Sequence, residues 1–204
     1  MKKLIVIIFV FVLSTSFAQD MDPHKTDPDM KSVKTKALKM EFFAPLTGNF
    51  TLGYESYIKD GISWEAKFGI IGAGKNIENQ KGAFARVGPK FKIRPDYITK
   101  GMVSAHPLRG AYIKPELVIN HFRSDDSYGY PGYETTKESH TGGAILINYG
   151  KQFVLGNKIT LDWSIGLGYG FGNDGDGGFR YGFASGGSDL PIAGSAGFTL
   201  GILL

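Results

Sequence analysis

The sequence predicts an all-β fold, an eight-stranded antiparallel up-and-down transmembrane β-barrel, and three observations lead to this prediction. Residues 159–171 alternate strictly between large apolar side chains and small or polar ones, and a period of two is expected of a β-strand. Seven further segments of the chain alternate in the same way. The composition includes 29 Gly, 15 Phe and 10 Tyr with 21% charged residues, which suits a crowded barrel interior and glycine-rich loops.

Residues 1–18 have the three parts of a secretory signal peptide. Two lysines precede the apolar run 4–13, and the small residues Ser16 and Ala18 stand where a signal peptidase requires them. The apolar run is too short to span a bilayer as a helix. We therefore expect cleavage after Ala18 and export from the cytoplasm.

The barrel is expected over residues 33–204, after a lead-in. Residues 19–32 are polar and contain two Asp-Pro steps, which predicts a flexible periplasmic segment. The predicted strands of the barrel are, in order, 33–43, 49–58, 62–71, 82–93, 108–122, 142–153, 159–171 and 192–204.

Each predicted strand has one apolar face and one face of charged, polar or small residues. In the first four strands the apolar residues are Leu38, Met40 and Phe42; Phe50, Leu52, Tyr54 and Ile58; Ile62, Trp64, Ala66, Phe68 and Ile70; and Ala83, Ala85, Val87, Phe91 and Ile93. In the last four they are Ala111, Ile113, Leu117 and Ile119; Ile145, Ile147, Tyr149 and Phe153; Ile159, Leu161, Trp163, Ile165, Leu167, Tyr169 and Phe171; and Ile192, Ala196, Phe198, Leu200 and Ile202. Such a one-sided strand needs an apolar medium, and ~9–11 residues are enough to cross a bilayer.

The predicted connections are short at one end of the barrel and long at the other. Tight hairpins are expected at 59–61 and 156–158. The long polar loops are expected at 72–81, 123–141 and 172–191. This asymmetry is typical of outer-membrane barrels, whose long loops lie outside the cell. Two connections depart from it, a short outer loop at 44–48 and a long periplasmic one at 94–107.

The polar faces of the strands fit the interior of a narrow barrel better than a water-exposed surface. A soluble barrel would need charged residues along its outer face, whereas the last three strands offer mainly Gly, Ala, Ser, Thr and Asn there. Eight strands enclose only enough room for side chains, and buried charges must pair. The predicted interior charge network consists of Lys39, Glu41, Glu55, Glu65, Lys67, Arg86, Lys90, Lys114, Glu116 and Asp162.

The cysteine and charge content exclude several kinds of protein. The chain has no cysteine, which excludes disulfides, cysteine-based metal sites, a thiol nucleophile and a lipid-modified N-terminal cysteine. Lys and Arg number 23 against 19 Asp and Glu. Because this small excess is scattered along the chain, we expect no nucleic-acid partner.

Several short motifs resemble one family of membrane proteins. They are the signal junction at 16–19 and the strand segments 82–90, 145–151, 165–170 and 197–201. With them, nearly all of the mature chain resembles the small eight-stranded outer-membrane β-barrels of the OmpX and OmpA-barrel type, in the versions typical of Bacteroidota. The resemblance implies an outer-membrane location, contact with membrane lipid and lipopolysaccharide, and insertion by the outer-membrane assembly machinery. The chain departs from the family in ending on Ile-Leu-Leu instead of an aromatic residue.

Glycine-rich stretches resemble nucleotide-binding and calcium-binding motifs without the context that these motifs need. Residues 69–76 nearly match a P-loop, but Asn76 replaces the Ser or Thr that would hold Mg²⁺. Residues 170–175 fit GxGxxG with no βαβ unit around them. Residues 173–177 begin like a calcium loop whose later ligands are missing. We therefore predict no cofactor and no metal.

The outer ends of the fifth and sixth predicted strands carry residues that could support catalysis. The candidates are His121, Ser124, Asp125 and His140. If the hairpin brings the two histidines close to hydroxyls and carboxylates, it could form a Ser-His-acid hydrolase or a metal site. A polar extracellular loop explains the same residues more simply. We expect His106, in a turn, to be solvated.

The function that follows is that of a non-enzymatic barrel with a filled interior. It would give structure to the envelope and display loops 123–141 and 172–191 to an extracellular ligand, using the aromatic contact area of Tyr128, Tyr130, Tyr133, Phe179, Tyr181 and Phe183. One alternative is an outer-leaflet enzyme that modifies lipid A through His121 and His140. Another is a soluble periplasmic carrier of hydrophobic ligands, like a lipocalin.

Overall fold

The structure is a computed structural model, and it describes residues 33–59, 61–73, 80–93, 106–126, 136–172, 178–186 and 189–204. The predicted signal peptide and lead-in, residues 1–32, lie outside the described residues. No helix in the described part of the chain is long and apolar enough to cross a membrane.

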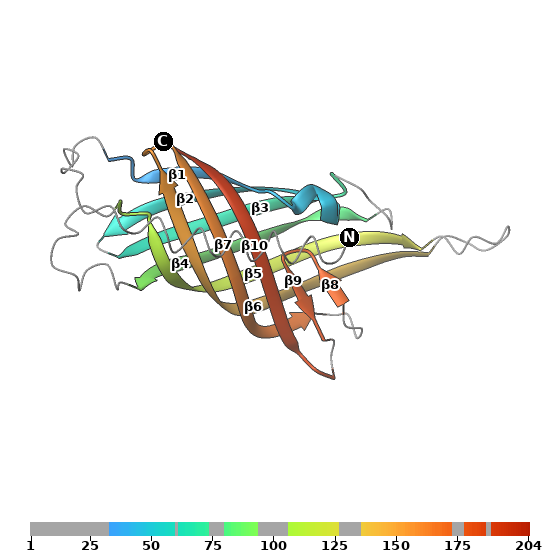
Figure 1. Cartoon of the computed structure of the whole chain (residues 1–204). Helices are drawn as coiled ribbons and strands as arrows, with labels where there is room; N and C mark the ends of the chain where they lie inside the picture. Colours follow the sequence, from blue (N-terminus) through green and yellow to red (C-terminus); the bar gives the residue numbers. More distant parts are fainter. Residues whose placement is uncertain are drawn as a thin grey trace, which may run out of the picture.

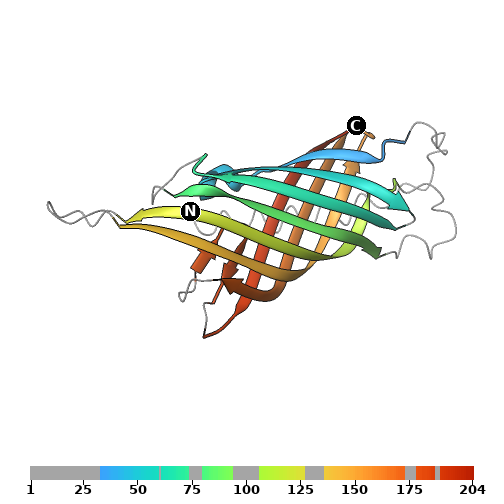
Figure 2. The same ribbon diagram turned by 180° about the vertical axis from the view of Figure 1, so that it is seen from behind.

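Eight antiparallel strands close into a barrel (Figures 1 and 2), as the sequence predicts. They are β1 (Lys36–Glu41), β2 (Asn49–Lys59), β3 (Ile62–Ile71), β4 (Lys81–Ile93), β5 (Gly110–Asp126), β6 (Thr136–Leu155), β7 (Ile159–Gly172) and β10 (Ile192–Leu203). Each strand pairs with the next in this order, and β10 pairs with β1 to complete the ring. We call the end where β1 begins and β10 finishes the terminal end, and the opposite end the loop end.

Burial alternates along the strands and shows which face is the interior. In β3 the residues Ser63, Glu65 and Lys67 are buried, while Trp64 and Phe68 on the opposite face are exposed. The same alternation holds on the other side of the barrel, where Asp162 is 3% exposed and Leu167 is 71% exposed. The barrel is therefore inverted relative to a soluble one, with polar residues inside and apolar residues outside.

The tight turn predicted at 156–158 forms at the terminal end, whereas the turn predicted at 59–61 includes residue 60, which lies outside the described residues. Gly156 and Asn157 both have positive φ angles, 57° and 54°, and Lys158 N donates to Leu155 O at 3.1 Å. This is the geometry of a type I′ turn, whose twist matches that of the two flanking strands. At the other predicted turn, Gly61 has a φ of 72°.

Strands β5 and β6 are longer than the sequence predicts, and much of the expected loop 123–141 is paired. The ladder runs without interruption up to the pair Asp126↔Thr136, although neither neighbouring strand pairs with it beyond Arg123 and Gly142. Figures 1 and 2 show this two-stranded ribbon projecting past the other strands. This ribbon lies beyond the barrel wall, so neither of its faces needs to be apolar. Backbone pairing alone does not require apolar side chains.

The expected loop 172–191 contains a hairpin that the sequence did not reveal. Strands β8 (Gly178–Arg180) and β9 (Phe183–Ser185) pair with each other, and β9 pairs with β10 at Ala193 and Gly194, nearer the loop end than the part of β10 that pairs with β1. Tyr181 and Phe183 are 6% and 3% exposed. The prediction that these two aromatic residues belong to a display surface is therefore wrong. The other predicted display aromatics, Tyr128, Tyr130, Tyr133 and the side chain of Phe179, lie outside the description.

A short 3₁₀ helix, η2 (Ala44–Thr47), occupies the predicted short outer loop between β1 and β2. Gly48 ends it with a φ of 76°.

Candidate functional site in the barrel interior

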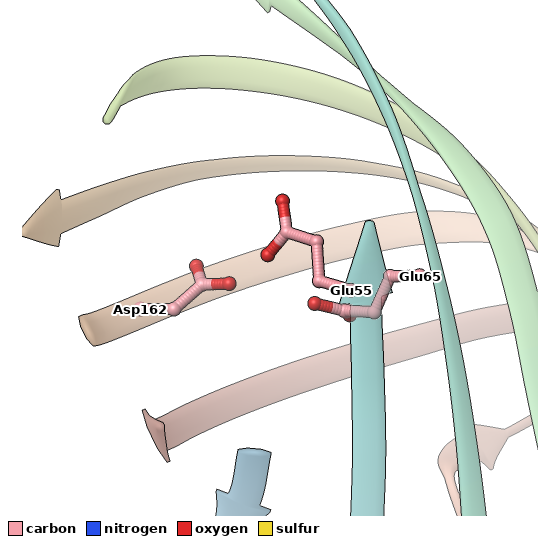
Figure 3. A group of neighbouring side chains, drawn as sticks. All are labelled: Glu55, Glu65 and Asp162. Carbon is pink, nitrogen blue, oxygen red and sulfur yellow. The ribbon is translucent and has the colours of Figure 1, made fainter. Parts of the chain in front are cut away.

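The centre of the interior is a cluster of three carboxylates from β2, β3 and β7 that encloses two ammonium groups. Figure 3 shows Glu55, Glu65 and Asp162 with their carboxylates turned toward one another. Lys39 Nζ lies 2.8 Å from Glu65 Oε2 and 2.9 Å from Asp162 Oδ2, and it also contacts Glu55. Lys90 Nζ lies 2.7 Å from Asp162, 2.7 Å from Glu65 and 3.2 Å from Glu55. Each positive charge is thus shared by three negative ones.

A second set of ion pairs continues from this cluster toward the loop end. Lys114 Nζ bridges Glu65 at 2.9 Å and Glu116 at 2.6 Å. Arg86 bonds Glu116 at 2.6 Å with one nitrogen and approaches Glu41 at 3.2 Å with another. Lys67 Nζ completes the set at 2.9 Å from Glu41. The structure thereby joins all residues of the predicted charge network.

The network is stable in a buried space because each of its carboxylates contacts at least two cationic side chains. An isolated charge in this interior would lose its hydration without compensation, which costs several kcal/mol. Glycines on the polar faces leave room for the long lysine stems. A Cβ on Gly201 would lie 2.9 Å from Lys39 Cγ, and one on Gly53 would lie 3.0 Å from Lys67 Cγ.

Uncharged side chains that were not in the predicted network add hydrogen bonds to it. Tyr112 donates from its hydroxyl to Asp162 Oδ1 at 2.7 Å, and its ring lies 4.4 Å from Lys90 Nζ. Gln152 Oε1 accepts from Lys39 at 2.9 Å and from Lys90 at 3.0 Å. The alternation places both residues on the polar face, but their partners depend on how the strands align around the barrel.

The three central carboxylates have the spacing of a metal site but not its chemistry. One oxygen from each of Glu55, Glu65 and Asp162 lies within 4.8 Å of the others. The ammonium groups of Lys39 and Lys90 already contact these oxygens. A divalent cation would therefore be repelled by two fixed positive charges at short range.

The terminal end of the interior is closed by the turn that precedes β5. Leu108 is fully buried and packs with Ala37 and Leu203, and its carbonyl accepts from Lys92 Nζ at 2.7 Å. Lys92, which was not included in the predicted network, contacts this turn and reaches Glu55 only at 3.9 Å.

His106 holds this turn in place and is not solvated as expected. Leu108 N donates to His106 Nδ1 at 3.2 Å, so Nδ1 carries no proton. The proton is therefore on Nε2, which lies 3.1 Å from Asn157 Oδ1. Burial lowers the pKa of His106 below its usual 6.5. The neutral ring thus links the turn to the β6–β7 hairpin.

The β8–β9 hairpin closes the loop end. Phe183 packs with Val118, Leu146 and Ala193, and the ring of Tyr181 lies 5.3 Å from that of Phe122. Tyr181 also donates from its hydroxyl to Gln80 Oε1 at 2.6 Å. The interior is thus filled in three layers, which are the turn, the charge network and the hairpin.

The structure does not assemble the predicted rim site. Register pairs His121 with Thr141 and Phe122 with His140, so the two histidines lie on opposite faces of the ribbon. His121 Nδ1 lies 2.8 Å from Thr141 Oγ1. The side chain of Asp125 lies outside the description.

Ser124 and His140 do meet, and the nearby Glu138 approaches the histidine nitrogen that faces the serine. Ser124 Oγ lies 3.0 Å from His140 Nε2, and Glu138 approaches the same nitrogen at 3.9 Å. In a Ser-His-acid triad the acid holds Nδ1 so that Nε2 can take the serine proton. The His140 ring instead stacks on Phe122, with centroids 5.0 Å apart.

Comparison with known proteins gives one structural likeness. No protein-family model matches the sequence, and no curated protein matches it. The N-terminal β-barrel domain of OprF from Pseudomonas aeruginosa is similar at a TM-score of 0.46 and 10% sequence identity. The match covers 84% of this chain and 96% of that domain.

Proposed function

We propose that this protein is an outer-membrane β-barrel of the small OmpX or OmpA-barrel type, exported with a cleaved signal peptide. The observation that carries the proposal is the inverted burial of the barrel wall. Ile147, Ile165 and Ile202 are each about as exposed as a surface lysine would be, at 63%, 58% and 63%. In contrast, Asp162 on β7 and the charged residues Lys39, Glu55 and Glu65 on β1, β2 and β3 are buried.

An aqueous surface does not account for this wall. Monomeric soluble proteins rarely expose contiguous apolar patches larger than about 300–600 Å², whereas here exposed apolar side chains occur on all eight barrel strands. In a membrane these apolar side chains contact lipid instead of water, so their exposure carries no free-energy cost of hydration. A closed barrel also satisfies its backbone hydrogen bonds between strands, which a membrane-spanning structure requires.

The same burial pattern argues against the soluble carrier. A lipocalin-like barrel holds its ligand in an apolar interior, and the centre of this interior contains paired charges instead. The enzyme alternative loses its main support too, since His121 and His140 face apart. We therefore propose a non-enzymatic role.

We propose that the protein gives structure to the envelope and presents the β5–β6 ribbon outside the cell. A filled interior supports a structural role more than solute passage. Among the described residues the ribbon projects well past the other strands (Figure 2), so it replaces the loop 172–191 as the main candidate for contact with an extracellular ligand. Removing residues 123–141 would then reduce attachment of cells to a matrix, and unchanged attachment would count against this role.

The membrane location is tested by cell fractionation combined with a gel-shift assay. We expect the mature protein in the outer-membrane fraction, migrating differently when unheated because the folded barrel resists the detergent. A mature protein found in the soluble periplasm, with no shift on heating, would overturn the proposal.

A further inference from the structure

The terminal end of the barrel carries basic side chains on its surface and no acidic side chain among the residues that the structure describes there. The basic residues are Lys34, Lys36, Lys59, Arg109, Lys151 and Lys158. The loop end is mixed, since Lys81 and Arg123 are accompanied by the exposed Glu138 and Asp189. Among the described residues, the surface of the barrel is therefore positively charged at the terminal end and of mixed charge at the loop end.

Two of these cationic side chains lie on the outer face of the barrel wall, together with its exposed apolar residues. Lys36 shares its face of β1 with the exposed Leu38 and Met40. Lys151 lies between the outward-facing Tyr149 and Phe153 on β6, and its Nζ extends over the Phe153 ring, 5.0 Å from the centroid. Phe153 is nearer the terminal end, so the lysine stem lies along apolar surface while its charge is directed toward that end.

Both tryptophans of the chain lie in register with these lysines. Lys151 pairs directly with Trp163, and Lys36 is aligned with Trp64 through Ser56 of the strand between them. Trp163 has Tyr149 beside it at 6.0 Å, and Trp64 has Tyr54 at 5.9 Å. Trp and Tyr concentrate at the headgroup level of membranes, so the register places Lys36 and Lys151 where phosphate groups would lie.

We propose that the terminal end of the barrel is a binding surface for anionic glycerophospholipids, with Lys36 and Lys151 contacting the headgroup phosphates. The inference rests on the proposed membrane location and adds the lipid class that the barrel selects. Cationic side chains near a membrane surface attract anionic lipid with a free energy that falls off within a Debye length. Lipid headgroups are the occupant that fits, because the two lysines stand on the lipid-facing side of the wall and not in its interior.

The two tryptophans make the inference directly measurable. The full chain is refolded into bilayers of brominated phosphatidylcholine in which increasing amounts are replaced by unbrominated phosphatidylglycerol. Because brominated chains quench tryptophan on contact, the recovery of fluorescence from Trp64 and Trp163 gives the binding constant of phosphatidylglycerol relative to phosphatidylcholine. We expect a relative constant above one, which decreases at high salt.

Matched double variants identify the groups responsible. Lys36→Gln with Lys151→Gln lowers the relative constant by about fivefold for each lysine if both contact headgroups fully. Lys81→Gln with Arg123→Gln removes the same amount of charge from the loop end, where these two residues are opposite each other on β4 and β5. This variant should leave the relative binding constant unchanged.

Two results would overturn the inference while leaving the membrane location intact. They are a relative constant of one in the wild-type protein, or an equal constant in the two double variants. A chain whose tryptophans are not quenched even in pure brominated phosphatidylcholine would instead overturn the membrane location itself.

Discussion

Asp162 shows how a single side chain is committed to the interior of this barrel. It accepts from Lys39 and Lys90 through one oxygen and from Tyr112 through the other. Its place in the strand alternation predicts that it faces inward, and both of its carboxylate oxygens are already hydrogen-bonded within the barrel. It therefore acts as a structural anion.

Replacing Asp162 with asparagine should destabilise the folded barrel by about 3–5 kcal/mol, because removing one partner of a buried ion pair leaves the other charge uncompensated. The measurement is urea unfolding of the barrel in lipid vesicles, followed by tryptophan fluorescence. Asp189→Asn, at an exposed position, serves as the control.

A second substitution separates charge from packing. Adding Lys39→Met to Asp162→Asn removes the one positive charge that the loss of Asp162 leaves in excess, so the double variant should recover part of the lost stability. Additive losses in the two single variants would contradict a shared network.

His106 predicts a pH dependence of stability. Since burial lowers the pKa of His106 in the folded state, the unfolded chain binds its proton first. The contribution of His106 is thus fully present above pH 6.5 and is lost as the pH falls through the folded-state value. Between pH 7.5 and 5, wild type should lose more stability than His106→Gln in the same urea assay. An equal loss in both would show that the ring is solvated.

At the scale of elements, the β8–β9 hairpin depends on Gly182. This residue has a φ of 94°, and a Cβ on it would lie 3.0 Å from Val118 and 3.4 Å from Arg86. Glycine is therefore required both by the backbone conformation and by the close approach to the interior.

Gly182→Val should release the hairpin from the barrel mouth and expose Arg180 to trypsin. The measurement is the rate of cleavage after Arg180, followed by mass spectrometry on the folded protein. Ala184→Val adds the same kind of side chain at an exposed position of the hairpin and should leave the rate near that of wild type. Equal rates in the two variants would mean that the hairpin is not seated by Gly182.

The strands could be predicted from the sequence because each barrel strand has an apolar face at a period of two. The residues of the charge network could be predicted too, because they are the charged residues on the polar faces of the strands and their charges balance. Their partners could not be predicted, because Lys39 on β1 and Asp162 on β7 meet only through the register of the closed ring.

The ribbon and the hairpin were missed for different physical reasons. Beyond Arg123 the strand β5 has no apolar face. Its backbone pairing with β6 therefore leaves no alternation of apolar and polar residues from which a strand could be predicted. The hairpin is short and glycine-rich, and its order depends on tertiary contacts, such as those with Phe122, Val118 and strand β10. The rim histidines show how much depends on register, since a shift of one residue moves a side chain to the opposite face.

For the whole molecule, the interior and the exterior have exchanged the roles that they have in a soluble protein. Paired charges fill the centre, a turn and a hairpin close the ends, and apolar residues cover the outside. The proposed membrane location accounts for this exchange, because lipid solvates an apolar exterior.

A spin-label scan of β7 tests this most directly. The chain has no cysteine, so single cysteines from position 159 to 171 can each carry one nitroxide in lipid vesicles. We predict that accessibility to oxygen, which concentrates in lipid, oscillates with a period of two, with maxima at Leu161, Ile165 and Leu167 and minima at Asp162 and Ser164. Maxima at Asp162 and Ser164, or high accessibility of Leu161, Ile165 and Leu167 to a water-soluble nickel complex, would contradict the account.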